Sequence, residues 1–324
     1  MKNILVTGGA GYIGSFMTKR LLEEGNIVSV LDSLERGHEK AIDKRATFIN
    51  GNILDKDLLK DLFNKTSFDA VIHFAGYISM GESMERPGLY FENNTTGVVT
   101  LLDVMIQNNV KKIIFSSTAG VYGNPLQTPI PESHPKSPTN PYGESKLMVE
   151  HVLSWYKKIY GFSYAALRYF NASGAALDGA MGEAHNPESH IIPKAIHAAL
   201  TKEDFTLFGN DYDTKDGSAI RDYIHVLDLV EAHVLALKKL EEQGEYIYNV
   251  GTGKGYSNKE VITMVKKICG IDFNVTIGNR RQGDANILIA DPTLITNELH
   301  FLPKYSSLET IVETAWKWHK KNSK

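Results

Sequence analysis

The sequence predicts an α/β protein, built on a Rossmann-type doubly wound parallel sheet with a smaller, mixed α/β domain beside it. Short β-branched runs alternate with longer amphipathic stretches in the first half, which is typical of a parallel sheet covered by helices. A glycine-rich turn, Gly8 to Gly14, follows the first of these runs, and Asp32 closes the second. Past residue 170 the alternation stops, so we expect the smaller domain to begin there.

Local sequence patterns predict each strand and helix of the first half. The predicted strands are short and rich in Val and Ile, and cover residues 3–7, 27–31, 47–50, 70–74, 112–115 and 163–170. Helices are expected between them at residues 12–24, 55–63, 87–108 and 142–160, where apolar residues recur at helical spacing. Pro141 suits the first turn of the last of these helices, because a proline there gives up no helical hydrogen bond.

Residues 171–189 are rich in Gly, Ala and Asn, and they mark the predicted domain boundary. The first domain is expected to span residues 1–171 and the second residues 172–324. The second is discontinuous, because a segment near residues 223–250, which includes a predicted strand at 246–250, is expected to return to the edge of the first sheet.

Bulk composition excludes several classes of protein. The chain has 324 residues, of which 42% are hydrophobic, and a net charge of −3 with dispersed positive residues, so we expect a globular protein that does not bind nucleic acid. No apolar run approaches the ~20 residues of a membrane span, and the chain enters a strand pattern at Asn3 without a leader. We therefore expect no membrane association and a cytoplasmic location. Cys269, the single cysteine, excludes an intrachain disulfide and is expected to be a small apolar helix residue.

The glycine turn predicts a dinucleotide site. Gly8, Gly11 and Gly14 allow a tight turn, close approach of the backbone to a pyrophosphate, and close packing of the following helix, whose first turn contains Tyr12 and Ile13. Asp32 follows at the distance expected for a carboxylate that accepts both ribose hydroxyls. The 2′-phosphate of NADP would be repelled by the negative charge of Asp32, and only Arg36 is nearby to offset that repulsion. NAD is therefore favoured over NADP.

A second group of residues predicts acid–base chemistry. Tyr142 and Lys146 lie four residues apart on a predicted helix and so share a face. The ammonium is expected to lower the pKa of the phenol, which would otherwise be about 10. Thr118, at the end of the fifth predicted strand, adds a hydroxyl that can relay a proton. Together with the glycine turn, these residues indicate an enzyme that moves a proton and a hydride from an alcohol.

With these motifs the chain resembles the extended short-chain dehydrogenases/reductases over nearly its whole length, and within them the UDP-sugar 4-epimerases. The resemblance rests on Thr7-Gly8-Gly9-Ala10-Gly11-Tyr12-Ile13-Gly14-Ser15, His73-Phe74-Ala75-Gly76, Gly81-Glu82-Ser83, Asn93-Asn94, Ser145-Lys146-Leu147-Met148-Val149-Glu150, Leu167-Arg168-Tyr169-Phe170-Asn171, Phe208-Gly209-Asn210-Asp211-Tyr212, Asp216-Gly217, Arg221-Asp222-Tyr223-Ile224-His225-Val226 and Arg280-Arg281-Gln282-Gly283-Asp284.

The resemblance implies interconversion of UDP-glucose and UDP-galactose through a 4-keto sugar, with bound NAD taking and returning the C4 hydride. It implies a homodimer paired through residues 87–108 and 142–160. The NAD site would contain, besides the glycine turn, Asp32, Tyr142 and Lys146, the residues Asn52, Ile53, Phe74, Ala75, Gly76, Asn94, Ser116 and Tyr169. The UDP-sugar, in the second domain, would contact Thr118, Tyr142, Asn171, His190, Phe208, Arg221, Arg281, Asp284 and Leu288.

Three positions depart from the family pattern. Tyr77-Ile78 stands where many members carry a basic residue two positions after the His-Phe-Ala-Gly run, and Asn52 stands where an Asp commonly meets the adenine. Leu288 replaces a Tyr that narrows the sugar pocket in some members. From Leu288 we hypothesise that UDP-N-acetylglucosamine and UDP-N-acetylgalactosamine are also substrates.

Other functions remain open. A related dehydratase would need a proton-transferring pair where this chain has Ala119-Gly120, and another NAD-dependent nucleotide-sugar epimerase, or a decarboxylase acting on UDP-glucuronate, is favoured less by the phosphate and uracil motifs. A sensor that kept the fold and lost the chemistry would have no need of Tyr142 and Lys146. The histidines, including His73, His134, His151 and His225, show no close ligand spacing, so no metal site is predicted.

Overall fold

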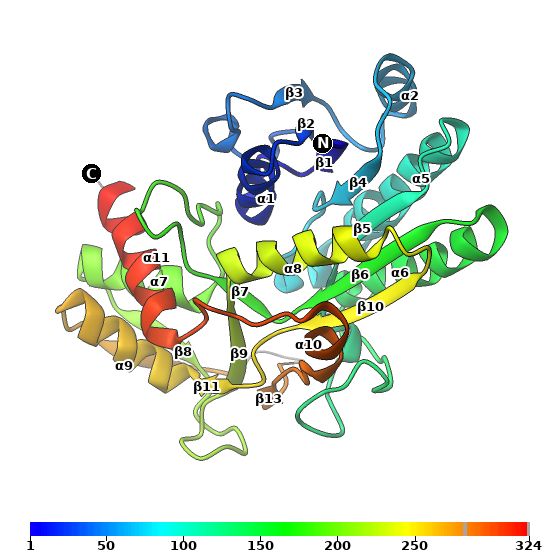
Figure 1. The fold of residues 1–324 in the computed structure, drawn as a ribbon. Helices are drawn as coiled ribbons and strands as arrows, with labels where there is room; N and C mark the ends of the chain where they lie inside the picture. The colour runs from blue at the N-terminus through cyan, green and yellow to red at the C-terminus, as the bar shows by residue number, and fades with distance from the viewer. Residues whose placement is uncertain (281–283, 323–324) are drawn as a thin grey trace. The chain divides into compact units, whose positions relative to one another are not determined.

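The computed structural model describes residues 1–280 and 284–322, and the chain divides into two compact units (Figure 1). The first unit comprises Met1–Tyr122, Lys136–Arg168 and Ala232–Tyr248. The second comprises Gly123–Pro135, Tyr169–Glu231 and Asn249–Lys324. The chain therefore passes between the units several times.

The first unit is built on a seven-stranded sheet with the order β10-β6-β5-β4-β1-β2-β3. The strands are β1 (Asn3–Thr7), β2 (Ile27–Asp32), β3 (Thr47–Asn50), β4 (Ala70–His73), β5 (Lys112–Thr118), β6 (Ser163–Tyr169) and β10 (Glu245–Val250). Pairing is parallel between β1 and its neighbours β2 and β4, between β2 and β3, and between β4 and β5. The doubly wound sheet predicted from the sequence is confirmed, because consecutive strands are added outward on both sides of β1 and β4.

Helices cover both faces of this sheet. They are α1 (Tyr12–Glu23), α2 (Lys56–Lys65), α3 (Met80–Glu85), α4 (Pro87–Tyr90), α5 (Gly97–Gln107), α6 (Pro141–Tyr160) and most of α8 (Val226–Lys239), with short turns η1 (Glu39–Ala41) and η3 (Ala119–Tyr122). A π-helical turn, η2 (Phe91–Thr96), joins α4 to α5. The helix predicted at residues 87–108 is therefore continuous from Pro87 to Gln107. Apolar residues of α2, α5 and α6 form one core with the strands, while α1 and α8 lie on the opposite side of the sheet (Figure 1).

The second unit has its own sheets and core. β7 (Asn171–Ser173), β11 (Gly255–Ser257) and β13 (Ile287–Leu288) all pair with β9 (Ile220–His225), and β8 (Phe205–Phe208) pairs with β12 (Val275–Gly278). The helices are α7 (Ile191–Thr201), α9 (Asn258–Cys269), α10 (Thr293–Leu299) and α11 (Leu308–Asn322). Apolar residues of α7, α9 and α11 close the core, against which the partly buried Cys269 packs.

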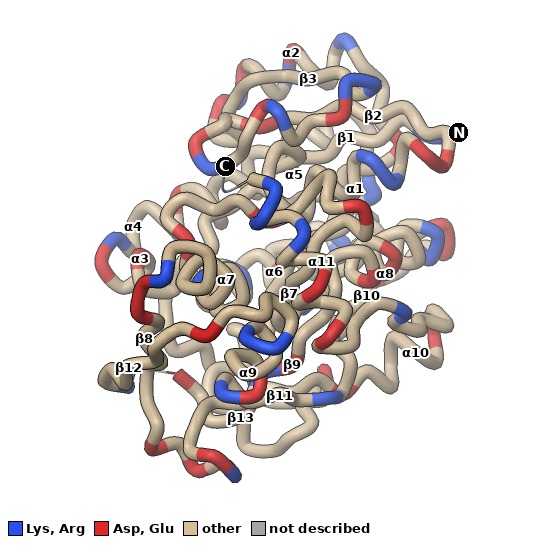
Figure 2. Tube along the Cα trace, turned by 90° about the vertical axis from the view of Figure 1, so that its left-hand side faces the viewer, with Lys and Arg blue, Asp and Glu red and all other residues tan. Residues whose placement is uncertain are grey.

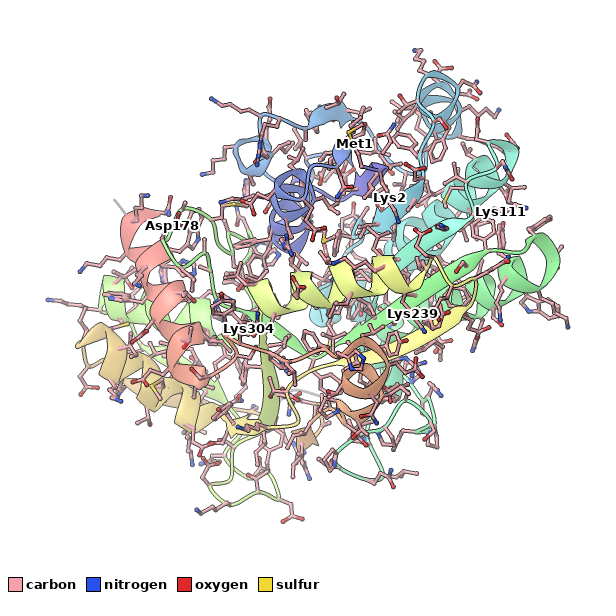
Figure 3. The ribbon with its side chains drawn as sticks, viewed as in Figure 1. Met1, Lys2, Lys111, Asp178, Lys239 and Lys304 are labelled. Carbon is pink, nitrogen blue, oxygen red and sulfur yellow. The ribbon has the colours of Figure 1, made fainter. Side chains whose placement is uncertain are left out.

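Charged residues of both signs are interspersed along the chain, as Figure 2 shows. Several are paired: Lys2, which precedes β1, pairs with Glu241, and Lys239 at the end of α8 pairs with Glu242; Figure 3 labels both lysines. No helix among the described residues combines the length and the apolarity that a membrane crossing demands.

Candidate active site

The glycine turn after β1 has no room for a side chain at Gly8 or at Gly14. Gly8 has a φ of +74°, and a Cβ there would lie 2.5 Å from the backbone nitrogen of Ala75. A Cβ on Gly14 would lie 2.2 Å from the carbonyl oxygen of Gly8. α1 begins directly after this turn, and its N-cap residue Gly11 offers no side-chain cap. Backbone N–H groups at such a helix start attract anions, so the turn fits the pyrophosphate of a dinucleotide.

Asp32 ends β2 beside this turn. Its carboxylate oxygens accept hydrogen bonds from the backbone N–H of Ala10 at 2.9 Å and of Leu34 at 2.8 Å. Burial raises the pKa of Asp32, and the two backbone hydrogen bonds oppose that rise. Arg36, the one cation considered as a partner for a 2′-phosphate, instead pairs with Glu82 at 2.8 Å and lies over the ring of Tyr77. This arrangement fits an unphosphorylated ribose.

Asn52 and Ile53, after β3, are placed differently from each other. The side chain of Asn52 accepts from the backbone of Leu54 at 2.9 Å and donates to Glu35 at 3.2 Å, which holds the turn in shape. Ile53 is buried in the core against Gly97. Any contact of Ile53 with a cofactor therefore goes through its backbone.

The segment after β4 lies next to the glycine turn. The backbone N–H groups of Phe74 and Ala75 both donate to the carbonyl of Thr7, at 2.9 and 3.1 Å. Beyond them, a Cβ on Gly76 would lie 3.1 Å from Asn94 Oδ1 and 3.4 Å from Lys146 Nζ. The Asn94 amide bonds to the backbone N–H and carbonyl of Tyr77 and to Ser145 Oγ. Asn94 thus ties this segment to α6.

The three predicted catalytic residues come together where β5 ends and α6 begins. Asn140 caps α6 through the backbone N–H of Gly143 at 2.9 Å, which places Tyr142 in the first turn and Lys146 one turn later. The hydroxyl of Thr118, the last residue of β5, accepts from the backbone N–H of Gly120 at 3.0 Å and lies close enough to the Tyr142 phenol to lower its pKa. The ammonium of Lys146 donates to the carbonyl of Ser116 at 2.9 Å.

Burial controls the charges of these groups. Lys146 is only 1% exposed, and burial lowers its pKa to about 7. Burial also raises the pKa of Tyr142, although the hydrogen bond from Thr118 lowers it. The phenol pKa is thus above its ordinary value and not below it as expected, because a phenolate loses hydration in this site.

Within the second unit, Arg221, Asp284 and Leu288 are neighbours. Arg221 on β9 forms an ion pair with Asp284, which also accepts from the Tyr212 hydroxyl at 2.9 Å. Leu288 on β13 lies opposite Arg221 in the strand pairing. A cavity of about 740 Å³ opens beside them, lined by residues 124–128 and by Asp213, Arg280, Asp284, Ala285, Asn286 and Ile287. Arg221 and Asp284 thus form an ion pair at the edge of this cavity.

Three other predicted residues lie at the ends of strands. Asn171 on β7 donates to the backbone carbonyl of Asp222 at 2.8 Å. Phe208 ends β8, where the ammonium of Lys194 lies 5.9 Å from its ring centroid. Tyr169 is a buried residue at the end of β6. Arg281 lies outside the described residues.

His190, the N-cap residue of α7, belongs to a cluster that the sequence interpretation missed. Its Nδ1 lies 2.7 Å from Glu183 Oε1 and 3.0 Å from Glu188 Oε1, and His185 Nδ1 lies 2.8 Å from Glu183 Oε1. Burial alone would lower the pKa of His190, but Glu183 and Glu188 raise it to about 10. Four such donors could hold a metal ion, yet donors around a tetrahedral zinc lie roughly 3.3 Å apart, given bonds of about 2.0 Å. These shorter separations are those of hydrogen-bonded ion pairs. The sequence pattern that could have revealed this cluster is Glu-x-His-x-x-Glu-x-His, from Glu183 to His190.

Known proteins resemble this chain in both sequence and structure. Residues 4–251 match the NAD dependent epimerase/dehydratase family. The UDP-glucose 4-epimerase of Halalkalibacterium halodurans is 50% identical over 321 residues, which cover 98% of this chain and 96% of the relative.

Two solved structures extend the likeness to the fold. The UDP-glucose 4-epimerase of Bifidobacterium longum, in complex with NAD+ and UDP, has a TM-score of 0.95 at 36% identity, covering 99% of each chain. The UDP-Glc/GlcNAc 4-epimerase of Campylobacter jejuni has a TM-score of 0.87 at 41% identity, covering 99% of this chain and all of its own. From the glycine turn, the assembled Thr118, Tyr142 and Lys146, and these full-length similarities, we conclude that the chain belongs to the NAD dependent epimerase/dehydratase family.

Proposed function

We propose that this protein is a UDP-sugar 4-epimerase that keeps NAD bound and interconverts UDP-glucose and UDP-galactose. The observation that carries the proposal is the assembly of Thr118, Tyr142 and Lys146 in the same unit as the glycine turn and Asp32. That unit would hold NAD, and the second unit would hold the UDP-sugar through Asn171, His190, Phe208, Arg221, Arg281 and Asp284. The similar UDP-glucose 4-epimerases support the choice of sugar.

The chemistry that NAD supplies when bound is acceptance of a hydride from the sugar C4 and return of that hydride. Tyr142, as phenolate, takes the proton of the 4-hydroxyl, and Thr118 hydrogen-bonds to the same oxygen. Inversion requires the 4-keto sugar to present its opposite face before Tyr142 returns the proton to O4. Tyr142 lies at the positive end of α6, which favours the phenolate, and Lys146 would bind the nicotinamide ribose of NAD.

The rival elimination reaction lacks its acid–base pair. Ala119 and Gly120 follow Thr118, and neither side chain can transfer a proton. A Cβ on Gly120 would lie 3.3 Å from the Thr118 hydroxyl oxygen, and Gly143 of α6 packs directly onto Gly120. The turn after β5 therefore leaves little room for an acidic side chain.

An NMR time course tests the proposal. The purified protein is incubated with UDP-galactose, without added cofactor, and the anomeric protons of both sugars are followed. We expect conversion to an equilibrium with UDP-glucose, and no conversion by Tyr142→Phe. Absence of turnover by the unaltered protein after NAD is added would refute the proposal and favour a sensor.

N-acetylated substrates are a second proposed activity. Leu288 lies beside Arg221 and is smaller than the Tyr found at this position in some relatives, so the sugar pocket can admit an N-acetyl group. The similarity to the UDP-Glc/GlcNAc 4-epimerase of Campylobacter jejuni supports this choice. Addition of UDP-N-acetylgalactosamine to the same NMR sample tests this activity. Conversion of UDP-galactose alone would show that Leu288 does not open the pocket to N-acetylated sugars.

The protein is further proposed to be a cytoplasmic homodimer that pairs through α5 and α6. Met148, Trp155 and Ile159 on α6 are exposed apolar residues at helical spacing, which form one stripe. Light scattering on the purified protein is expected to give twice the 36.0 kDa of one chain, and Trp155→Glu with Ile159→Glu to give a monomer. A wild-type monomer would contradict the proposal. Cell fractionation checks the location.

A further inference from the structure

Three consecutive residues at the end of β5 each contact a different turn of α6. The carbonyl of Ser116 accepts from Lys146 Nζ at 2.9 Å, the hydroxyl of Ser117 donates to Glu150 Oε1 at 2.6 Å, and Thr118 lies close enough to Tyr142 to lower the pKa of its phenol. Tyr142, Lys146 and Glu150 follow one another at intervals of four residues, so they share one face of the helix. The reaction uses the first two and gives no task to Glu150.

Glu150 is a buried carboxylate with more than one partner. It is 4% exposed and receives two hydrogen bonds from Arg168 of β6, at 3.0 Å from Nε and 2.6 Å from Nη2. Arg168 is 2% exposed, and its Nη1 donates to the Tyr122 hydroxyl at 2.8 Å. Ser117 and Tyr122 flank the segment that carries Thr118, so this network holds the segment on both sides.

Stability alone does not account for the network. A buried ion pair gains little over well-packed apolar residues of the same volume, because both charges lose their hydration. Apolar residues, however, could not fix the position of α6 along the axis of β5. Dispersion contacts have no direction, whereas hydrogen bonds do. A shift between strand and helix would separate Thr118 from Tyr142.

We propose that Glu150, supported by Arg168, is a positioning residue that holds Thr118 beside Tyr142 through Ser117. The proposal rests on the proposed function, because proton transfer at Tyr142 gives the alignment its purpose. Other ionisable groups around the network are Lys136, whose pKa burial lowers with a contribution from Arg168, and Tyr164, whose pKa burial raises with a small contribution from Glu150. Both stay in place in the variants below.

Ser117→Ala is the cleanest test, because it removes the link to β5 and leaves Glu150 paired with Arg168. We expect kcat to fall about 10-fold or more, as misalignment in an active site does, with the KM for UDP-galactose within about twofold of wild type. The acidic limb of the kcat–pH profile should move to higher pH, because the phenolate loses a well-placed Thr118. Ser163→Ala is the matched control: it removes another buried serine hydroxyl of this unit, which accepts from the Gly244 backbone at 3.1 Å. Its kinetics should equal those of wild type.

Glu150→Gln, checked first for folding by circular dichroism, should lower kcat at least as much as Ser117→Ala. If Ser117→Ala keeps the wild-type kcat and pH profile, the positioning role is refuted. A readout independent of activity separates this failure from failure of the proposed function: the pH titration of phenolate absorbance, with Tyr142→Phe to identify the signal. A higher Tyr142 pKa in Ser117→Ala than in wild type supports the inference even if no UDP-sugar turns over, and an unchanged pKa contradicts it.

Discussion

Gly14→Ala tests whether the glycine turn is built for close packing of backbone on backbone. The added Cβ would lie 2.2 Å from Gly8 O and 2.9 Å from Gly9 Cα, so the first contact is about 1.2 Å short of the 3.4 Å at which ordinary contact begins. Both neighbours are backbone atoms of a tight turn, and neither can rotate away. Overpacking in a core costs typically 1–3 kcal/mol, so we expect about 3 kcal/mol here.

The assay is thermal unfolding of the purified variant, together with the amount of NAD that it retains. A loss of about 3 kcal/mol should lower Tm by roughly 5–10 °C. Retained NAD should also fall, because the turn and the start of α1 must move apart. Gly81→Ala in α3 is the control, since a Cβ there meets nothing within 4 Å and a helical Ala should leave stability equal or slightly higher. A Gly14→Ala protein with wild-type Tm and NAD content would refute the reasoning.

Four further outcomes are expected. Arg168→Met should lower the free energy of unfolding, measured in urea, by about 3–5 kcal/mol, because it leaves the Glu150 carboxylate buried without its partner. Adding Glu150→Leu to the same chain should restore most of that stability. Equal instability of the single and double variants would contradict this. Burial lowers the pKa of Lys146 to about 7, so above pH 7 the unfolded chain binds a proton that the folded chain does not, and the free energy of unfolding should rise by up to about 1.4 kcal/mol per pH unit from this group. Lys146→Met should flatten that slope between about pH 7 and 10, and parallel slopes would argue against it. The pKa of His190 is raised to about 10, so its charged form stabilises the fold fully below the ordinary pKa of 6.5, and this stabilisation is lost as the pH rises through 10. The ring resonances of His190 should titrate near 10 in wild type and closer to 6.5 in Glu183→Gln. The same pKa in both proteins would contradict this explanation. Leu288→Tyr should lower turnover of UDP-N-acetylgalactosamine by about 100-fold and leave UDP-galactose within about twofold, and equal effects on both sugars would remove the steric argument.

Much of the first unit could be predicted from the sequence, because its elements carry strong local patterns. The strands at 3–7 and 47–50 match β1 and β3 at both ends, and α6 starts one residue before the predicted helix. β5 runs three residues beyond its predicted end, to Thr118. Ser116 and Ser117 look like loop residues in the sequence, but in the structure they belong to the strand and contact Lys146 and Glu150.

The charge states and pairings could not be predicted, because they depend on burial and on distant partners. The phenol of Tyr142 has a raised pKa owing to its surroundings, which no spacing of residues reveals. Arg221 and Asp284 are 63 residues apart, and only the fold makes them an ion pair. The site roles assigned to residues such as Asn171 and Phe208 stay predictions until a ligand is bound.

Hydride return is the central claim, and one experiment tests it most directly: UDP-galactose is epimerised by the purified protein in deuterium oxide, without added cofactor, and the UDP-glucose formed is analysed at C4. The account predicts that C4 keeps its original hydrogen, because the hydride leaves and returns without meeting solvent, while Tyr142 exchanges only the proton on O4. Deuterium at C4 of the product would show that the hydrogen leaves as a proton, and that result would contradict the account.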